Sequence, residues 1–183
     1  PNAQIIQGGT DLMVEINFNH RKPTDVIALR RVDEIRGYAL SADRSKVIVG
    51  SGMPYQKMEH GEFADLFPAL AQAARTVGSP QIRAAGSIGG NLGTCSPAGD
   101  ALPVLSALDA VINLRTETTS RDVTIHDFML GVKRNARLPG ELIVSATLPV
   151  INGWQGYAKV GVRNAMVISV ASCCLVVDRN LGT

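Results

Sequence analysis

Gly86-Ser87-Ile88-Gly89-Gly90-Asn91, near the middle of the chain, and Gln7-Gly8-Gly9-Thr10-Asp11, near its beginning, are the two stretches that most constrain the fold. Each combines a glycine pair with hydroxyl or carboxamide side chains. Glycine lets the backbone turn tightly and approach a ligand closely. Backbone amides freed in this way, with hydroxyl groups beside them, favour phosphate oxygens. Either stretch taken alone can equally be a structural turn.

Familiar catalytic and nucleotide-binding motifs are missing from the sequence. The second stretch lacks the Lys-Ser/Thr ending of a P-loop and the G-x-G-x-x-G spacing of a Rossmann turn. The sequence contains no Gly-x-Ser-x-Gly nucleophile elbow. His20, His60 and His126 have no metal-ligand spacing, and the three cysteines form no CxxC pair. We therefore expect no metal or iron–sulfur cluster within this chain.

The composition narrows the class of protein further. The chain has 183 residues, of which 45% are hydrophobic and 19% charged, with a net charge of +2 and 4% aromatic residues. These values predict a globular domain and argue against nucleic-acid binding. The longest near-apolar run, 167–177, is too short for a membrane span and predicts a buried strand. An odd cysteine count and no signal peptide make the cytoplasm the expected compartment.

Hydrophobic periodicity and breaker residues predict more strands than helices, without strict β-α-β alternation. We therefore predict an α+β fold. Residues 79–99 are expected to be a long irregular loop, and Asp100 is expected to cap a helix or to bind a ligand. The predicted helices are 12–17, 67–76 and 100–108, and the predicted strands are 4–7, 25–29, 47–50, 111–115, 121–124, 141–148, 155–162 and 168–178.

The order of these motifs resembles one known family. Gly8-Gly9-Thr10-Asp11-Leu12 is followed by Val77-Gly78-Ser79-Pro80-Gln81-Ile82-Arg83, by the second glycine stretch, and by Ser96-Pro97 and Asp100. This pattern is similar to the FAD-binding medium subunit of the molybdenum hydroxylases, such as xanthine dehydrogenase and carbon monoxide dehydrogenase. The segment 159–165 resembles the later lysine and basic segment of that family.

The resemblance implies a two-subdomain FAD-binding fold of the xanthine dehydrogenase medium-subunit or vanillyl-alcohol-oxidase-like type. It implies that the first loop wraps the FAD pyrophosphate, that the second forms a further backbone clamp, and that Val77 and Thr94 lie near the flavin. Asp100 would anchor the cofactor by a polar contact. The implied cofactor-binding residues are Ile5, Ile6, Gln7, Gly8, Gly9, Thr10, Asp11, Leu12, Val77, Ser87, Ile88, Gly89, Gly90, Asn91, Thr94, Asp100, Ile143 and Lys159, with no catalytic or metal-binding residue in this chain.

The same resemblance gives expectations for the domains. Residues 1–150 would be the FAD-binding domain, without its usual opening segment, and 151–183 would begin a truncated C-terminal domain. Ala84 stands where relatives commonly carry asparagine, and Gln7 where alanine or valine is usual. Neither departure removes a backbone donor.

The implied function is electron transfer within a molybdenum hydroxylase. A large molybdopterin subunit would hydroxylate the substrate, a small iron–sulfur subunit would pass electrons to FAD, and an external acceptor such as NAD would receive them. An alternative is a stand-alone FAD-dependent oxidoreductase with its own substrate, although no acid/base set for one is evident. A third is an interaction subunit whose glycine loops are only structural.

Overall fold

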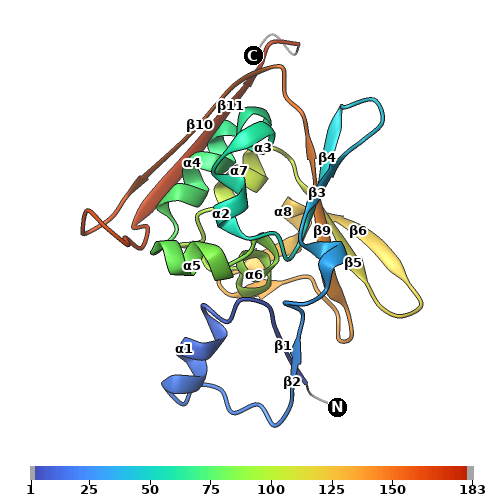
Figure 1. Ribbon diagram of the computed structural model, residues 1–183, viewed down its shortest axis with the longest axis vertical. Coiled ribbons are helices and arrows are strands. Elements are labelled where there is room, and N and C mark those ends of the chain that lie inside the picture. Colours follow the sequence, from blue (N-terminus) through green and yellow to red (C-terminus); the bar gives the residue numbers. More distant parts are fainter. Residues whose placement is uncertain (1–2, 181–183) are drawn as a thin grey trace.

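The computed structural model describes residues 3–180. Its main sheet has five antiparallel strands (Figure 1). Buried and exposed side chains alternate along β4: Val47 and Val49 are buried, whereas Lys46 and Ile48 are exposed. This is the pattern expected of a sheet with one buried and one solvated face. In spatial order the strands are β3 (Tyr38–Leu40), β4 (Lys46–Gly50), β9 (Leu142–Pro149), β5 (Val111–Arg115) and β6 (Ser120–Thr124).

Short helices pack against this sheet and complete the core. Phe63, Phe67 and Phe128 are fully buried between them. The helices are α2 (Tyr55–Met58), α3 (Gly61–Leu66), α4 (Pro68–Thr76), α5 (Pro80–Ala85), α6 (Ile88–Thr94), α7 (Leu102–Ala107) and α8 (Ile125–Phe128), followed by a small hairpin of β7 (Met129–Gly131) and β8 (Arg134–Asn135). The mixture of strands and helices agrees with the α+β prediction.

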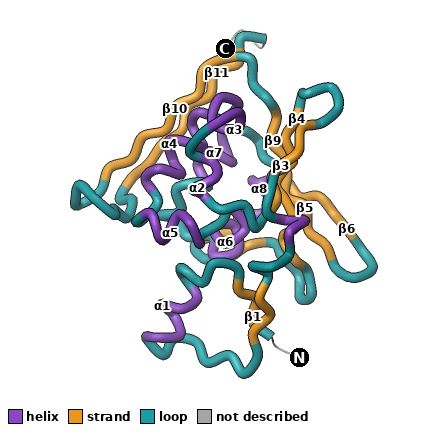
Figure 2. The backbone as a smooth tube through the Cα atoms, viewed as in Figure 1, coloured by secondary structure: helices purple, strands orange, loops and turns teal. Residues whose placement is uncertain are grey.

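The first 30 or so residues form a separate N-terminal lobe, defined here as residues 3–32. It consists of β1 (Gln4–Ile6), α1 (Leu12–Asn17) and β2 (Val26–Ala28). The two strands pair in parallel, and α1 lies between them in the sequence. A 3-10 turn, Asp33–Ile35, follows the lobe. None of its residues is buried. Figure 2 shows the lobe beneath α5 and α6, joined largely by loops. The lobe therefore has no core of its own.

The last two strands form an antiparallel ribbon that packs on helices of the core. β10 (Gly153–Val160) lies against α4, and β11 (Ala171–Asp178) lies against α7. The prediction of a buried strand over 167–177 is wrong: the strand begins at Ala171, alternate residues of it are exposed, and Ile168 and Val170 before it are exposed. The helices cover only one face of the ribbon, so alternate side chains point away from them.

The prediction of an irregular loop over 79–99 is also wrong, because this segment holds α5 and α6. Pro80 occupies the first turn of α5, and the Ser79 hydroxyl accepts a hydrogen bond from the Ile82 amide. Ser87 caps α6 in the same way, through the Gly90 amide. Serine caps and a proline in the first turn start a helix, and packing then overrides the low helix propensity of the glycines.

Asp100 does not cap α7, which corrects that part of the prediction. The residue before α7 is Ala101, and no side chain caps this helix. The carboxylate of Asp100 instead meets the side chains of Lys159 and Tyr157 on β10. No helix in the described part of the chain is long and apolar enough to cross a membrane.

Candidate functional site

A cavity of about 450 Å³ lies where the N-terminal lobe faces α5, α6 and the end of α4. A pocket of this size suits a small-molecule or cofactor site. It gathers sixteen of the eighteen residues that the sequence singles out, from five separate segments of the chain. They are Ile5, Ile6, Gln7, Gly8, Gly9, Thr10, Asp11, Leu12, Val77, Ser87, Gly89, Gly90, Asn91, Thr94, Asp100 and Ile143.

The first glycine loop presents amide groups that have no protein partner. Within residues 3–180, the backbone amides of Gly8, Gly9, Thr10 and Asp11 donate no hydrogen bond to another residue. Gly9 has φ of +70°, and a Cβ on Gly8 would overlap the carbonyl of Ala85 at the end of α5. The two glycines therefore let the loop turn and lie directly against α5. Amide groups need a partner, so this loop requires solvent or a ligand.

The second glycine stretch is arranged differently from the first. The amide of Gly89 donates to the Ser51 carbonyl at 2.8 Å, and that of Gly90 donates to the Ser87 hydroxyl at 3.2 Å. A Cβ on Gly89 would lie 2.5 Å from the Cβ of Ser51. Gly89 is thus explained by close packing of α6 on the segment that follows β4. Two of the amides expected to be free for a ligand are already bonded within the protein.

Gly90 and Gly93 have no comparable packing reason. A Cβ on Gly90 would meet only the Ser87 hydroxyl at 3.5 Å, and one on Gly93 only the Cδ1 of Ile143 at 3.8 Å. Both residues lie in α6 and line the cavity. Glycine inside a helix costs up to about 1 kcal/mol relative to alanine. The open space beside them is therefore best explained by a ligand that lies against this face of α6.

A buried ion pair closes the inner end of the site. The Nζ of Lys159 lies 2.9 Å from Oδ2 of Asp100 and also donates to the carbonyl of Thr76 at 3.0 Å. The hydroxyl of Tyr157 donates to Oδ1 of Asp100 at 2.8 Å. The Lys159 side chain is only 3% exposed and that of Asp100 10%. Asp100 reaches the cavity, whereas Lys159 lies behind it and neutralises its charge.

Two of the predicted residues do not line the cavity. Lys159 is one, for the reason just given. Ile88 is the other: its side chain is fully buried in the core, so any contact with a ligand would have to come from its backbone. Val77 does line the cavity, and Arg83 fixes its position by donating to the carbonyls of Val77 and Gly78 at 3.3 Å each while pairing with Glu59.

Several lining residues were not predicted from the sequence, because they belong to no recognisable motif. Lys133 between β7 and β8 pairs with Glu15 of α1 at 3.3 Å, and Arg21 pairs with the same carboxylate at 2.6 Å. Thr94 of α6 donates to the carboxylate of Asp11 at 3.1 Å. These side-chain contacts connect the N-terminal lobe to the rest of the molecule. Tyr55, Gly93 and Arg137 also line the cavity.

Three residues that line this cavity each carry a buried polar atom that lacks a hydrogen-bond partner within residues 3–180. The atoms are the Oε1 of Gln7, the Oδ1 of Asn91 and the hydroxyl of Tyr55. Buried polar groups are nearly always paired in folded proteins. The three atoms are buried and do not open onto the cavity, so the unpaired amides of the first loop are the groups that indicate a polar ligand.

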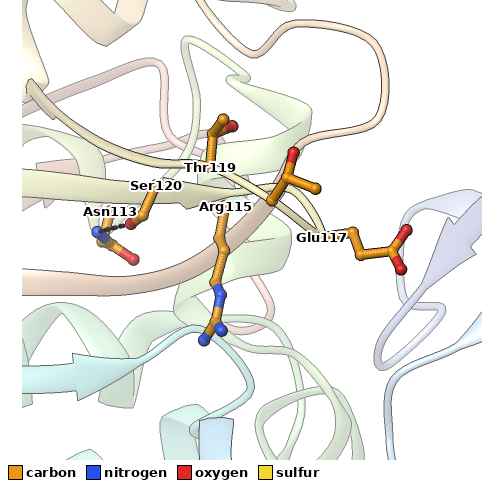
Figure 3. Close-up of a pocket in the computed structure, with 6 residues that line it drawn as sticks. Asn113, Arg115, Glu117, Thr119 and Ser120 are labelled. Carbon is orange, nitrogen blue, oxygen red and sulfur yellow. Dashed lines mark hydrogen bonds between the residues drawn. The ribbon is translucent and has the colours of Figure 1, made fainter.

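A second hollow, of about 260 Å³, lies at the turn between β5 and β6 (Figure 3). Its walls are the exposed ends of the hairpin, where Asn113 bonds to Ser120 and Thr116 to Thr119. It contains none of the residues singled out by the sequence. Within residues 3–180, no group of three or more His, Cys, Asp or Glu side chains is placed to hold a metal ion.

The site combines free loop amides, an open glycine face on a helix and a buried carboxylate at its far end, within an α+β domain. These features are those of a domain that holds an extended, phosphate-bearing cofactor. Comparison with known proteins gives the family: residues 1–151 match the FAD binding domain in molybdopterin dehydrogenase, and the chain belongs to this family. The cavity agrees with FAD, whose pyrophosphate needs amide donors and whose hydroxyls need polar partners.

Individual relatives support the same assignment. The nicotinate dehydrogenase FAD-subunit of Eubacterium barkeri is 34% identical over 91% of this chain and 57% of its own length. The glyceraldehyde dehydrogenase medium chain of Sulfolobus acidocaldarius is 29% identical over 96% of this chain and 62% of its own. The chain therefore spans about three fifths of these relatives.

Solved structures show the same fold. Carbon monoxide dehydrogenase from Hydrogenophaga pseudoflava superimposes with a TM-score of 0.87 at 26% identity, over 94% of this chain and 60% of that one. Quinoline 2-oxidoreductase from Pseudomonas putida 86 gives 0.87 at 22% identity, over 93% and 59%. The expectation of the molybdenum hydroxylase FAD-binding fold is confirmed.

Proposed function

We propose that this chain is the FAD-binding part of a medium subunit in a molybdenum-containing hydroxylase. The bound FAD would accept electrons from iron–sulfur clusters of a small partner subunit and release them to an external acceptor such as NAD. A large molybdopterin subunit would oxidise the substrate. The names of relatives as FAD-subunits and medium chains support this assignment. The observation that carries it is the row of unbonded amides at Gly8–Asp11, in residues that line the cavity.

The residues of this chain bind and orient the cofactor. The amides of the first loop would hold the pyrophosphate, and Gly90 and Gly93 would let the cofactor lie against α6. Val77 and Ile143 supply apolar walls. Asp100 would accept a hydrogen bond from the cofactor while Lys159 keeps its carboxylate neutralised. We assign no acid or base to this chain, because electron transfer requires only position and electrostatic tuning.

The domain limits and the compartment belong to the same proposal. A family match that ends at residue 151 supports an FAD-binding domain over 1–150 and a second domain beginning in 151–183. A cytoplasmic location is supported by cysteines that form no disulfide in residues 3–180: Cys95 is buried, and Cys173 and Cys174 are adjacent.

The proposal is tested by the visible absorption spectrum of the full-length protein as purified, with mass analysis of the cofactor released on denaturation. We expect FAD at near-stoichiometric level. Co-purification of molybdenum- and iron-containing chains would separate a hydroxylase subunit from a stand-alone flavin enzyme. A colourless protein that takes up no FAD, either alone or in the co-expressed complex, would contradict the proposal.

Replacing Gly90 or Gly93 by alanine is expected to stabilise the apoprotein while weakening its binding of FAD. The apoprotein should gain up to about 1 kcal/mol in free energy of unfolding per substitution, because helix propensity improves and no protein atom is crowded. The affinity for FAD should fall at least about tenfold, since the new methyl group occupies the ligand space. Chemical denaturation of the apoprotein and FAD titration by fluorescence measure the two effects. Gly37→Ala is the control, because a Cβ there meets nothing within 4 Å.

FAD is also expected to protect the N-terminal lobe from protease. The lobe contains no buried residue and contacts the rest of the molecule mainly around the cavity, so few protein contacts oppose its opening. Trypsin should cut apoprotein rapidly at the exposed pairs Arg21-Lys22 and Arg30-Arg31, and several-fold more slowly with FAD bound. Mass spectrometry monitors the cleavage. Equal cleavage rates without FAD and at saturating FAD would contradict a cofactor that holds the lobe in place.

A further inference from the structure

Side chains provide the polar attachment of the N-terminal lobe to the rest of the molecule. Within the described part of the chain, no backbone hydrogen bond joins residues 3–32 to residues 36–180. The side-chain hydrogen bonds between the two parts are Gln7 to the Gly52 carbonyl at 3.4 Å, Thr94 to Asp11 at 3.1 Å and Lys133 to Glu15 at 3.3 Å. Because so few contacts oppose its opening, the lobe can move as a unit.

Glu15 of the lobe has one cationic partner on each side of this boundary. Its Oε2 pairs with Arg21 of the same lobe at 2.6 Å, and its Oε1 with Lys133 of the β7–β8 turn at 3.3 Å. Arg21 also donates to the Oε1 of Gln4 at 2.8 Å, so it belongs firmly to the lobe. If the lobe moved away, Glu15 would keep Arg21, and the Lys133 side chain, already 56% exposed, would be hydrated. Opening therefore leaves no buried charge unpaired.

Lys133 is held in place by the end of α6. Its backbone amide donates to the carbonyl of Cys95 at 2.9 Å, and the neighbouring Asn135 donates to the carbonyl of Gly93 at 2.9 Å. Lys133 has φ of +53°, in the left-handed region that glycine adopts without strain. A lysine therefore stands in this turn at a conformational cost, and its side chain adds the ion pair with Glu15.

The ion pair spans the two walls between which a ligand would lie. Glu15 and Lys133 both line the cavity, with the first glycine loop on the lobe side and α6 on the other. We propose that Glu15 and Lys133 are positioning residues that form a latch, whose ion pair holds the lobe closed over bound FAD and slows release of the cofactor. This inference rests on the proposed function, because it takes FAD as the ligand. The two residues act through the position of the first loop.

The first test is the rate at which FAD leaves Lys133→Met, followed by flavin fluorescence. We expect dissociation about threefold faster than from the wild type, within the range for the loss of an exposed ion pair. The apoprotein should melt at the same temperature, because no core contact changes. Lys133→Arg should keep the wild-type rate. Lys46→Met is the matched control, since Lys46 is exposed on β4 and does not line the cavity.

A double-mutant cycle separates a latch from direct contact with the cofactor. In a Glu15→Gln background, Lys133→Met should change the dissociation rate by less than about 1.5-fold, because the ion pair is already lost. An equal acceleration in both backgrounds would mean that Lys133 acts on FAD itself, which overturns the latch. An unchanged rate for Lys133→Met in the wild-type background overturns it as well.

Proteolysis of the apoprotein tests the latch without FAD. Trypsin should cut Lys133→Met about threefold faster than the wild type at Arg21-Lys22 and Arg30-Arg31, since cleavage follows the population of the open form. If the wild type binds no FAD, alone or in its complex, but this acceleration is seen, the proposed function fails and the latch stands. If FAD binds and neither cleavage nor dissociation changes, the latch alone is overturned.

Discussion

Replacing Lys159 by methionine is expected to lower the free energy of unfolding of the apoprotein by about 3–5 kcal/mol, the range for removing one partner of a buried ion pair. The change leaves the Asp100 carboxylate, 10% exposed, with the Tyr157 hydroxyl as its remaining side-chain partner. It also removes the bond from Lys159 to the Thr76 carbonyl at the end of α4. β10 would thus lose a polar attachment to the core.

Chemical denaturation of the single and double variants measures this effect. Asp100→Asn alone should also destabilise the protein, because it leaves the Lys159 ammonium buried without a carboxylate. The double variant Asp100→Asn/Lys159→Met should recover much of the loss, since neither charge then remains unpaired. If Lys159→Met unfolds within 1 kcal/mol of the wild type, the pair does not stabilise the fold as argued.

Valine at Gly8 is expected to remove FAD binding while leaving the core folded. The side chain would overlap the carbonyl of Ala85 and force the first loop away from α5. The loop that carries the four unbonded amides would then be displaced from the wall of the cavity. The core should remain, because no residue of the N-terminal lobe is buried in it. We expect flavin content below detection, at least about a hundredfold weaker binding, and an almost unchanged far-ultraviolet circular dichroism spectrum.

Gly37→Val is the matched control for this substitution. Gly37 lies outside the lobe, and a Cβ there meets no atom within 4 Å. This variant should retain its flavin. Gly89→Val is a poorer test, because its side chain would collide with Ser51 and disturb the core directly. Flavin retained at wild-type level in folded Gly8→Val protein would mean that the first loop does not hold the cofactor.

The structure explains why some sequence predictions succeeded and others did not. The helix over 12–17 was predicted with its observed bounds, and 47–50 lies within β4. Both depend on local periodicity and on glycine or acidic residues at their ends. The segment 79–99 was predicted wrongly because glycine lowers helix propensity. Serine caps start both of its helices, and α6 is held in addition by Ile88 and Leu92, which are buried against the rest of the core.

The sequence by itself determined the α+β class, the two glycine stretches and the family pattern that connects them, because backbone freedom, hydrophobic periodicity and motif order are all written locally along the chain. Only the tertiary structure decided what each residue does. It paired Asp100 with Lys159, and it assigned Gly89 to packing and Gly90 to open space. The reason is physical: the environment of a side chain depends on partners far away in sequence, and folding alone brings those partners together.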